Sequence, residues 1–290
     1  MTWRTVAIIT QSKISSKNNL LIIQNDDGVH SVPLSDIGTV LINSTRSVIT
    51  THAIDELLKK DIRIICCDDK GFPNGQIMPK RSSTGRRQKI MMQMHWDQLR
   101  KDRLWQHIIQ EKIRIQAQTL EYLDIGKTSE LFSLIAQVTP GDADNREAVA
   151  SHLYFPRLFS YEFTRNDEEQ NINSLLNYGY AIILSEVSRC IALHGYLNEF
   201  GIHHDNDHNP YNLACDLMEP FRPFVDEEAF AIGSTPLTPE IKQRLIRLLR
   251  RDNDRLRTSL AVAIEGFVSK ALRYLREENA ELPQVRSFAE

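Results

Sequence analysis

A run of potential metal ligands lies in the segment FGIHHDNDHNPYNLACDLMEPFRPFVD, residues 200–226. It holds three of the nine histidines of the chain together with five acidic residues. Asn209 before Pro210 is typical of a helix start and predicts a short helix over 210–218. Asp216 and Glu219 are three residues apart, so they share one face of that helix. The segment therefore places two carboxylates on one side of a short helix.

The residues around these carboxylates decide what chemistry is open to them. Pro220 and Pro223 are expected to end the helix, which leaves Glu219 at its end. If the chain before the helix folds back over it, His203 or His204 can reach Glu219. One imidazole with carboxylate oxygens, and no cysteine, suits Mg²⁺ or Mn²⁺ better than a structural zinc ion. A polar turn whose side chains only cap the backbone fits the same spacing, and by spacing alone it is the more common case.

A second candidate acid follows Asn145. Asn145 is a good N-cap residue, which places Glu147 in the first turn of a helix over 146–159. A carboxylate there complements the positive end of the helix dipole. By spacing alone, Glu147 is therefore better explained as a helix-start acid than as a metal ligand.

A basic run lies at residues 242–257, with seven basic residues and two aspartates. Arg244, Arg247 and Arg251 repeat at helical spacing opposite a row of leucines. A DNA phosphate backbone fits such a face, and so does the solvated side of an amphipathic helix. The pattern leaves both readings open.

Two kinds of secondary structure are expected to position these residues. Short β-branched or aliphatic runs predict strands at 5–10, 19–24, 29–33, 37–42, 62–67 and 76–78, with one helix at 49–60 and a hairpin connection at 25–28. Helical periodicity follows at 90–123, 129–136, 146–159, 175–200, 210–218, 239–250 and 259–278. We therefore expect an α+β protein with a small β-rich domain at 1–79, a basic linker at 80–89 and a larger all-α domain at 90–290.

Composition excludes several classes of protein. The chain of 290 residues is 41% hydrophobic and 25% charged, which are ordinary globular values. Its apolar runs are far shorter than the roughly 20 residues of a membrane span, and no secretory cleavage pattern follows the N-terminus, so we expect a cytoplasmic protein with no membrane partner. The net charge of −3 gives the whole molecule no attraction for nucleic acid, so any DNA site must be a local patch.

Several short motifs occur together in one order. They are W-R-T-V from Trp3, S-K-x-S-x-K-N-N at 12–19, C-D-D-K at 67–70, N-R-E at 145–147, Y-G-Y at 178–180, and H-x-N-x-x-N-x-x-N from His204 running into D-L-M-E-P-F-R-P at 216–223. In this order and spacing the chain resembles the CRISPR-associated endonuclease and integrase that inserts new spacers, the Cas-one family of the adaptation complex, and most closely its type II form. The resemblance spans nearly the whole chain.

The resemblance implies a fold and a site. It implies a β-sandwich-like N-terminal domain and an α-helical catalytic domain, with Mg²⁺ or Mn²⁺ held by Glu147, His204 and Glu219. Asp216 would be an auxiliary ligand, and His203 would be the ligand if the match is displaced by one residue. Where relatives commonly have glycine and arginine, this chain has Ala148 and His152, and neither change removes a ligand.

The resemblance also implies a reaction and partners. The 3′-hydroxyl of a short double-stranded DNA would attack a phosphodiester of a CRISPR repeat, with water in its place giving a nuclease, and Arg146 and Arg222 would contact phosphates. The family works as homodimers that flank a dimer of a second adaptation protein, Cas-two, and in type II systems an effector nuclease is a possible partner. Two alternatives use the same residues: a branched-DNA repair nuclease, and a DNA-binding scaffold without catalysis.

Overall fold

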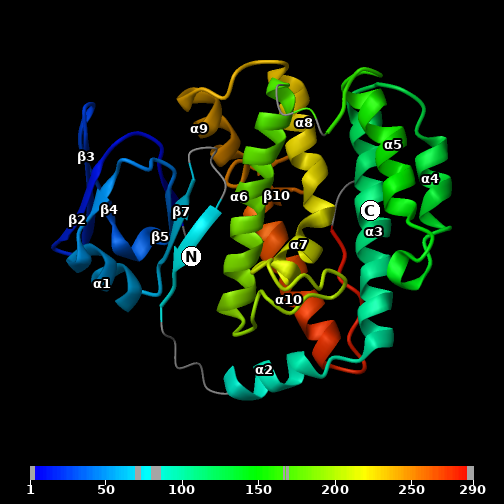
Figure 1. Ribbon diagram of the computed structural model, residues 1–290, viewed down its shortest axis with the longest axis horizontal. Coiled ribbons are helices and arrows are strands. Elements are labelled where there is room, and N and C mark those ends of the chain that lie inside the picture. Colours follow the sequence, from blue (N-terminus) through cyan, green and yellow to red (C-terminus); the bar gives the residue numbers. More distant parts are fainter. Residues whose placement is uncertain (1–3, 69–72, 80–85, 166, 168–169, 286–290) are drawn as a thin grey trace. The chain divides into compact units, whose positions relative to one another are not determined.

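The structure is a computed structural model that describes residues 4–68, 73–79, 86–165, 167 and 170–285 (Figure 1). The chain divides into two compact units. The first comprises Met1–Ser83 with Leu237–Arg247, and the second Thr84–Pro236 with Leu248–Glu290. The α+β composition confirms the expected fold class. Across the described residues, no helix combines the length and the apolar character needed to span a membrane.

Within its described residues, the first unit contains two four-stranded sheets. One has the strand order β1-β5-β7-β8 and the other β4-β3-β2-β6. The strands are β1 (Arg4–Ile8), β2 (Lys13–Lys17), β3 (Leu20–Asn25), β4 (Gly28–Pro33), β5 (Ile37–Ile42), β6 (Val48–Ile49), β7 (Arg63–Cys67) and β8 (Pro73–Ile77), with helix α1 (Thr51–Lys59) before β7. Side chains from both sheets, including Ile14 and Ile64, share one buried core with Leu57 of α1. This arrangement agrees with the sandwich-like domain that the resemblance implied.

Local signals explain the elements that were expected. The β3–β4 hairpin pairs Asn25 with Gly28, whose φ of 131° is open to glycine. The Thr50 side chain accepts a hydrogen bond from Ala53 N and caps α1. The pairings β1–β5 and β5–β7 are parallel and join strands that are not consecutive in the sequence. Strand β2 was missed because it has the polar sequence KISSK, with Ile14 as its one buried residue.

The second unit is helical. It contains α2 (Arg86–Met94), α3 (Gln98–Tyr122), α4 (Ser129–Ile135), α5 (Arg146–Leu158), α6 (Asn171–Leu193), α7 (Asn212–Met218), α8 (Arg222–Ile232) and α10 (Leu260–Arg276). Helix α9 (Pro239–Leu248) belongs mostly to the first unit. The long helix α3 packs against α4, α5 and α8, while α6 packs against α7, α8 and α10 (Figure 1).

The predicted helix at 90–123 is two helices. Asp97 separates α2 from α3, because its side chain accepts from Arg100 N and caps a new helix. The predicted linker at 80–89 is only partly visible, since 80–85 lie outside the described residues and α2 already begins at Arg86.

The helix ends around the candidate ligands also differ from expectation. Helix α7 begins at Asn212 rather than Pro210, because the Asn209 side chain accepts from Tyr211 N in a turn instead of capping a helix. Pro220 and Pro223 do not stop the helical path. Each lies in the first turn of the next helical segment, Glu219–Phe221 or α8, where no backbone N–H is needed.

The basic run at 242–257 does not form one helix. Helix α9 ends at Leu248, and the chain then forms a two-stranded ladder of β9 (Asp252–Asn253) and β10 (Thr258–Ser259). The Asn253 side chain accepts from the backbone N–H groups of Arg255 and Leu256, which fixes the turn between these strands. The region expected to be all-helical therefore contains one short ladder.

Candidate metal centre

Two of the predicted ligands meet on a buried lysine. Asn145 caps α5, with its side chain accepting from Ala148 N, and this places Glu147 in the first turn as expected. Glu219 follows α7 and is 4% exposed. Lys112 of α3 donates from Nζ to Glu147 Oε1 at 2.5 Å and to Glu219 Oε2 at 2.6 Å. Three separate elements thus bring two carboxylates to one cation.

The chain before α7 folds back over the helix, as the candidate site required. The buried carboxylate of Asp216 accepts from the backbone N–H groups of Ile202, His203 and His204. His204 also donates from Nδ1 to Asp216 Oδ1 at 2.6 Å. Asp216 therefore orients His204 and leaves the Nε2 lone pair for a ligand, which is the usual arrangement of metal-binding histidines.

The two neighbouring histidines have different surroundings. The His203 ring stacks on buried Trp105 of α3, with ring centroids 4.3 Å apart and an interplanar angle of 1°. His204 meets the same indole edge-on at 5.8 Å. Of the two, His204 has a ring nitrogen hydrogen-bonded to a carboxylate. Its geometry therefore suits a metal ligand better than that of His203.

The opposite charges of the cluster shift the pKa values of Glu219, Lys112 and His204 in the direction that favours their charged forms. Burial acts to raise the pKa of Glu219, but Arg222 and Lys112 outweigh it and lower the pKa to about 2. Burial acts to lower the pKa of Lys112, but Glu219 and Glu147 outweigh it and keep the pKa above the usual value. The hydrogen bond to Asp216, with attraction from Glu219 and Glu147, raises the pKa of His204 against a smaller effect of burial. His204 and both glutamates therefore share one electrostatic environment.

The arginines that were expected to contact DNA phosphates differ in their hydrogen-bond and ion-pair partners. Arg222 donates from Nε to Glu219 Oε1 at 2.7 Å and lies over the Tyr180 ring. Arg146 has its Nε buried without a hydrogen-bond partner among the described residues. Arg251 pairs with Glu228 at 2.6 Å, and the end of α9 separates it from Arg244 and Arg247. The three arginines of the basic run are therefore not on one helical face.

Several residues of the cluster were not predicted. Lys112 lies on the buried face of α3 with Trp105, Ile108 and Ile115, so a lysine at an apolar position of the helix was the available signal. Asp142 accepts from the backbone N–H groups of Arg146 and Glu147 and so fixes the first turn of α5. His152, already noted in the sequence as a departure from relatives, is exposed on α5, and its ring Nδ1 bonds to the Ala148 carbonyl oxygen.

The donor types of this cluster fit a hard divalent cation, although Glu147 and His204 are partly exposed and, among the described residues, the ligand atoms of Glu147, His204 and Glu219 do not all lie within 4.8 Å of one another. Two carboxylates and an imidazole held by a third acid supply oxygen and nitrogen donors, and Lys112 shows that a cation is stable between the carboxylates.

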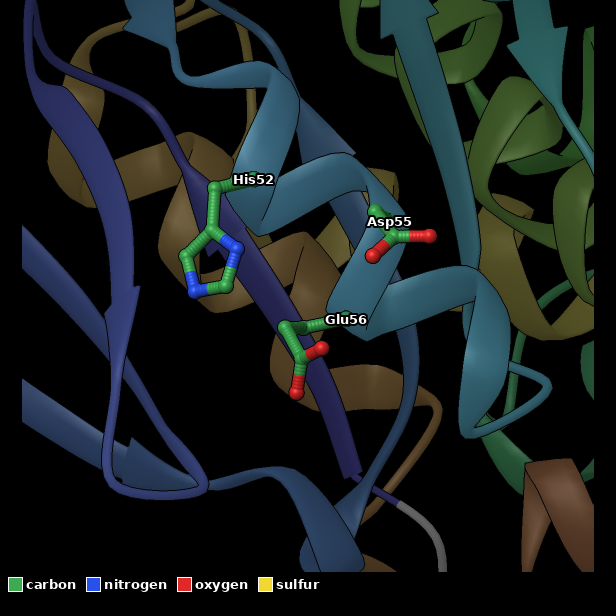
Figure 2. Close-up of side chains that lie close together, drawn as sticks. All are labelled: His52, Asp55 and Glu56. Carbon is green, nitrogen blue, oxygen red and sulfur yellow. The ribbon is translucent and has the colours of Figure 1, made fainter.

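A different group has its ligand atoms closer together. His52, Asp55 and Glu56, all on α1, form the one trio of such side chains in the described part of the chain with ligand atoms within 4.8 Å of one another (Figure 2). His52 and Asp55 are exposed and Glu56 is half-buried, and Lys59 already pairs with Asp55 at 2.6 Å and with Glu56 at 3.0 Å. An exposed acidic group of this kind is common without any metal.

Comparisons with known proteins identify the family to which the chain belongs. A family model for "CRISPR associated protein Cas1" matches residues 6–235. A CRISPR-associated endonuclease Cas1 of Neisseria meningitidis serogroup C (strain 8013) is 34% identical over 301 residues, covering 100% of this chain and 99% of the relative. A second relative, from Pyrobaculum aerophilum, is 28% identical and covers 74% of this chain and 77% of its own length.

Solved structures share the fold. A CAS1 protein from Thermotoga maritima has a TM-score of 0.80 at 16% identity, covering 99% of this chain and 100% of its own. A casposase bound to an integration product has a TM-score of 0.80 at 17% identity, covering 100% and 95%. A chain of a Cas6-RT-Cas1–Cas2 complex has a TM-score of 0.78 at 19% identity, covering 100% of this chain and 36% of that one.

Proposed function

Because the chain belongs to the CRISPR associated protein Cas1 family, we propose that it is a metal-dependent DNA endonuclease and integrase that inserts spacers into a CRISPR array. The observation that carries the proposal is the meeting of Glu147 and Glu219 on one buried cation, beside an imidazole oriented by Asp216. This arrangement supports phosphodiester chemistry without a covalent protein intermediate.

Each residue of the cluster has a role in this proposal. Glu147, Glu219 and His204 would hold Mg²⁺ or Mn²⁺, which supplies charge stabilisation at the scissile phosphate and at the attacking and leaving oxygens. Asp216 keeps the Nδ1 proton on His204, so that Nε2 is the free donor atom. Arg222 holds the other oxygen of Glu219.

The reaction itself exchanges one phosphodiester bond for another. The 3′-hydroxyl of the incoming duplex loses its proton and bonds to phosphorus, while the bond from phosphorus to the 3′-oxygen of the repeat strand breaks and that oxygen takes up a proton. With the DNA ends held in line, positioning provides much of the rate. Water in place of the hydroxyl gives DNA cleavage.

Partners follow from the relatives in the same way. One structure with this fold is part of a complex with Cas2, and another is a casposase bound to an integration product. We therefore propose double-stranded DNA, a second copy of this chain and a Cas2 dimer as partners, and a type II effector nuclease as a further one.

The test is strand transfer of a short 3′-hydroxyl duplex into a plasmid that carries a CRISPR repeat. Purified protein and its Cas2 partner are compared in Mn²⁺ and in EDTA. Half-site products that need Mn²⁺, vanish in His204→Ala and persist in His52→Ala are the expected result. His52 is the matched control because it belongs to the surface trio on α1.

Other outcomes favour the alternatives. Cleavage without joining would indicate a branched-DNA repair nuclease with the same metal site. Loss of activity in His52→Ala, with full activity in His204→Ala, would move the metal site to α1. DNA binding with no metal-dependent reaction would leave a scaffold.

A further inference from the structure

The cluster contains a cation of its own, and this feature has no part in the metal chemistry proposed above. Lys112 has a side chain that is 8% exposed, and its ammonium contacts carboxylate oxygens of both Glu147 and Glu219. We propose that Lys112 is a displaceable counter-ion: it holds the two carboxylates together before the metal binds, and a divalent cation expels it. This inference rests on the proposed function, since it assumes that the two glutamates are metal ligands.

The geometry makes the ammonium and a metal ion competitors. Lys112 Nζ lies 2.5 Å from Glu147 Oε1 and 2.6 Å from Glu219 Oε2. A Mg²⁺ ion bonds to carboxylate oxygens at about 2.0–2.1 Å, so it would need the space that the ammonium fills between these oxygens. Two cations at such close range also repel each other strongly where burial limits screening. Both cannot occupy the gap at once.

The surrounding charges allow Lys112 to leave. Glu219 keeps a second cationic partner, because Arg222 binds its other oxygen at 2.7 Å. The Asp142 side chain accepts from Glu147 N and holds the start of α5 independently of the lysine. The flexible four-carbon stem of lysine can move its ammonium several ångströms without moving the helix. The Glu147 backbone and the second oxygen of Glu219 thus keep their partners when the ammonium moves.

Stability alone does not explain a lysine here. Its neighbours on the same face of α3 include Trp105, Ile108 and Ile115, all buried. A buried ion pair is often no more stabilising than an apolar residue of similar volume, because desolvation opposes the attraction. A removable positive charge, in contrast, offsets the repulsion between the two carboxylates in the absence of metal and leaves when the metal ion binds.

The first test measures Mn²⁺ binding without DNA, by electron paramagnetic resonance of free Mn²⁺. In Lys112→Met the competing charge is absent, so we expect Mn²⁺ to bind at least about tenfold more tightly than in wild type, while the metal-free variant melts at a lower temperature. Lys270→Met, which removes an exposed lysine from α10, is the matched control and should bind Mn²⁺ as wild type does. Unchanged or weaker binding in Lys112→Met overturns the proposal, since a purely structural lysine would act in that direction.

A second measurement uses the wild-type chain and does not depend on how the variant folds. The chain is labelled with a small amine-reactive reagent and the modified lysines are quantified by peptide mass spectrometry. Lys112 should be modified several-fold faster in saturating Mg²⁺ than in EDTA, while the labelling rate of Lys270 should be the same in both. A Lys112 that stays equally protected in both conditions overturns the displacement. If wild type joins DNA in Mn²⁺ but these results fail, the Lys112 assignment alone is wrong; if wild type binds no Mn²⁺, both proposals fail.

Discussion

His204 depends on Asp216 for both its orientation and its charge. The carboxylate accepts three backbone N–H groups of the loop as well as the imidazole Nδ1–H. The same hydrogen bond raises the pKa of His204, with help from the nearby acids. The residue that prepares the imidazole for a metal therefore also makes protons stronger competitors for it.

This competition predicts a pH dependence of metal binding. A protonated imidazole cannot coordinate a metal, and its pKa lies above the ordinary value of about 6.5. Mn²⁺ affinity of the wild type should therefore begin to fall while the pH is still above about 6.5, and fall further as the pH drops. Titrations of Mn²⁺ from about pH 8.5 to about pH 5.5 measure it. In His204→Gln this step should be missing, and an affinity that stays level in wild type down to about pH 6 would contradict the assignment.

Asp226 provides a separate prediction about stability. It is fully buried, and Tyr180 donates its hydroxyl to Asp226 Oδ1 at 2.5 Å. Burial raises the pKa of Asp226 to about 6, although Tyr180 and nearby cations oppose this. Between about pH 4 and pH 6 the folded protein thus binds more protons than the unfolded chain, so its stability falls as the pH rises through that window.

The variant Asp226→Asn removes this titration and keeps an oxygen for Tyr180 to donate to. We compare the free energy of unfolding of the variant with that of wild type at about pH 4.5 and at about pH 7. The variant-minus-wild-type difference should be more favourable to the variant at the higher pH, by on the order of 2 kcal/mol. Urea denaturation of both proteins at the two pH values gives the number. A difference that is the same at both would show that Asp226 titrates normally.

At the scale of elements, two glycines allow close approach. Gly179 of α6 faces α8, and a Cβ added there would lie 2.3 Å from Val225 Cγ1. Gly179→Ala should cost about 1–3 kcal/mol of stability through overpacking. Val225→Ala frees the space, so the double variant should be more stable than the sum of the two single changes implies. Thermal or urea unfolding of the four proteins tests this, and strict additivity would argue against the contact.

Gly201 has the same role in the loop that carries His204. A Cβ there would lie 2.2 Å from the His204 carbonyl oxygen and 2.8 Å from Asp216 Oδ2. We expect Gly201→Ala to displace this loop and weaken Mn²⁺ binding at least about tenfold, because misplaced ligands lose most of their benefit. Gly266→Ala on α10 meets nothing within 4 Å and is the control, expected to bind Mn²⁺ normally. Normal binding by Gly201→Ala would show that the loop adapts.

Sequence patterns predicted several elements that have a local cause, although the Asp97 cap between α2 and α3 was missed. Thr50 and Asn145 cap their helices, and the hairpin at 25–28 follows from its turn residues. The parallel pairing of β1, β5 and β7 depends on partners distant in sequence, and no local pattern shows it. In the candidate site, Glu147, His204 and Glu219 were available through family motifs. Lys112 was not, because a charged residue on an apolar helix face is explained only by what it meets in three dimensions.

At the scale of the whole molecule, the proposed DNA partner would have to bind to local positive regions. The net charge of −3 provides no general attraction. The arginines of the basic run differ in what they can offer. Arg244 and Arg247 lie on α9, whereas Arg251 lies beyond its end and is neutralised by Glu228. Arg247 is exposed on α9, whereas the Arg251 guanidinium already pairs with a carboxylate, so moving Arg251 to a phosphate gains less binding free energy.

The salt dependence of DNA binding should therefore separate these arginines. Each phosphate contact contributes about 0.9 to the slope of log affinity against log salt concentration. We expect Arg244→Ala with Arg247→Ala to weaken binding to duplexes of any sequence and to reduce the slope by up to about two contacts. Arg251→Ala should leave the slope close to that of wild type, because Glu228 already balances its charge. Fluorescence anisotropy from about 50 to about 300 mM salt measures all three proteins. If Arg251→Ala flattens the slope as much as the double change, the ion pair with Glu228 opens on DNA and the basic run acts as one surface after all.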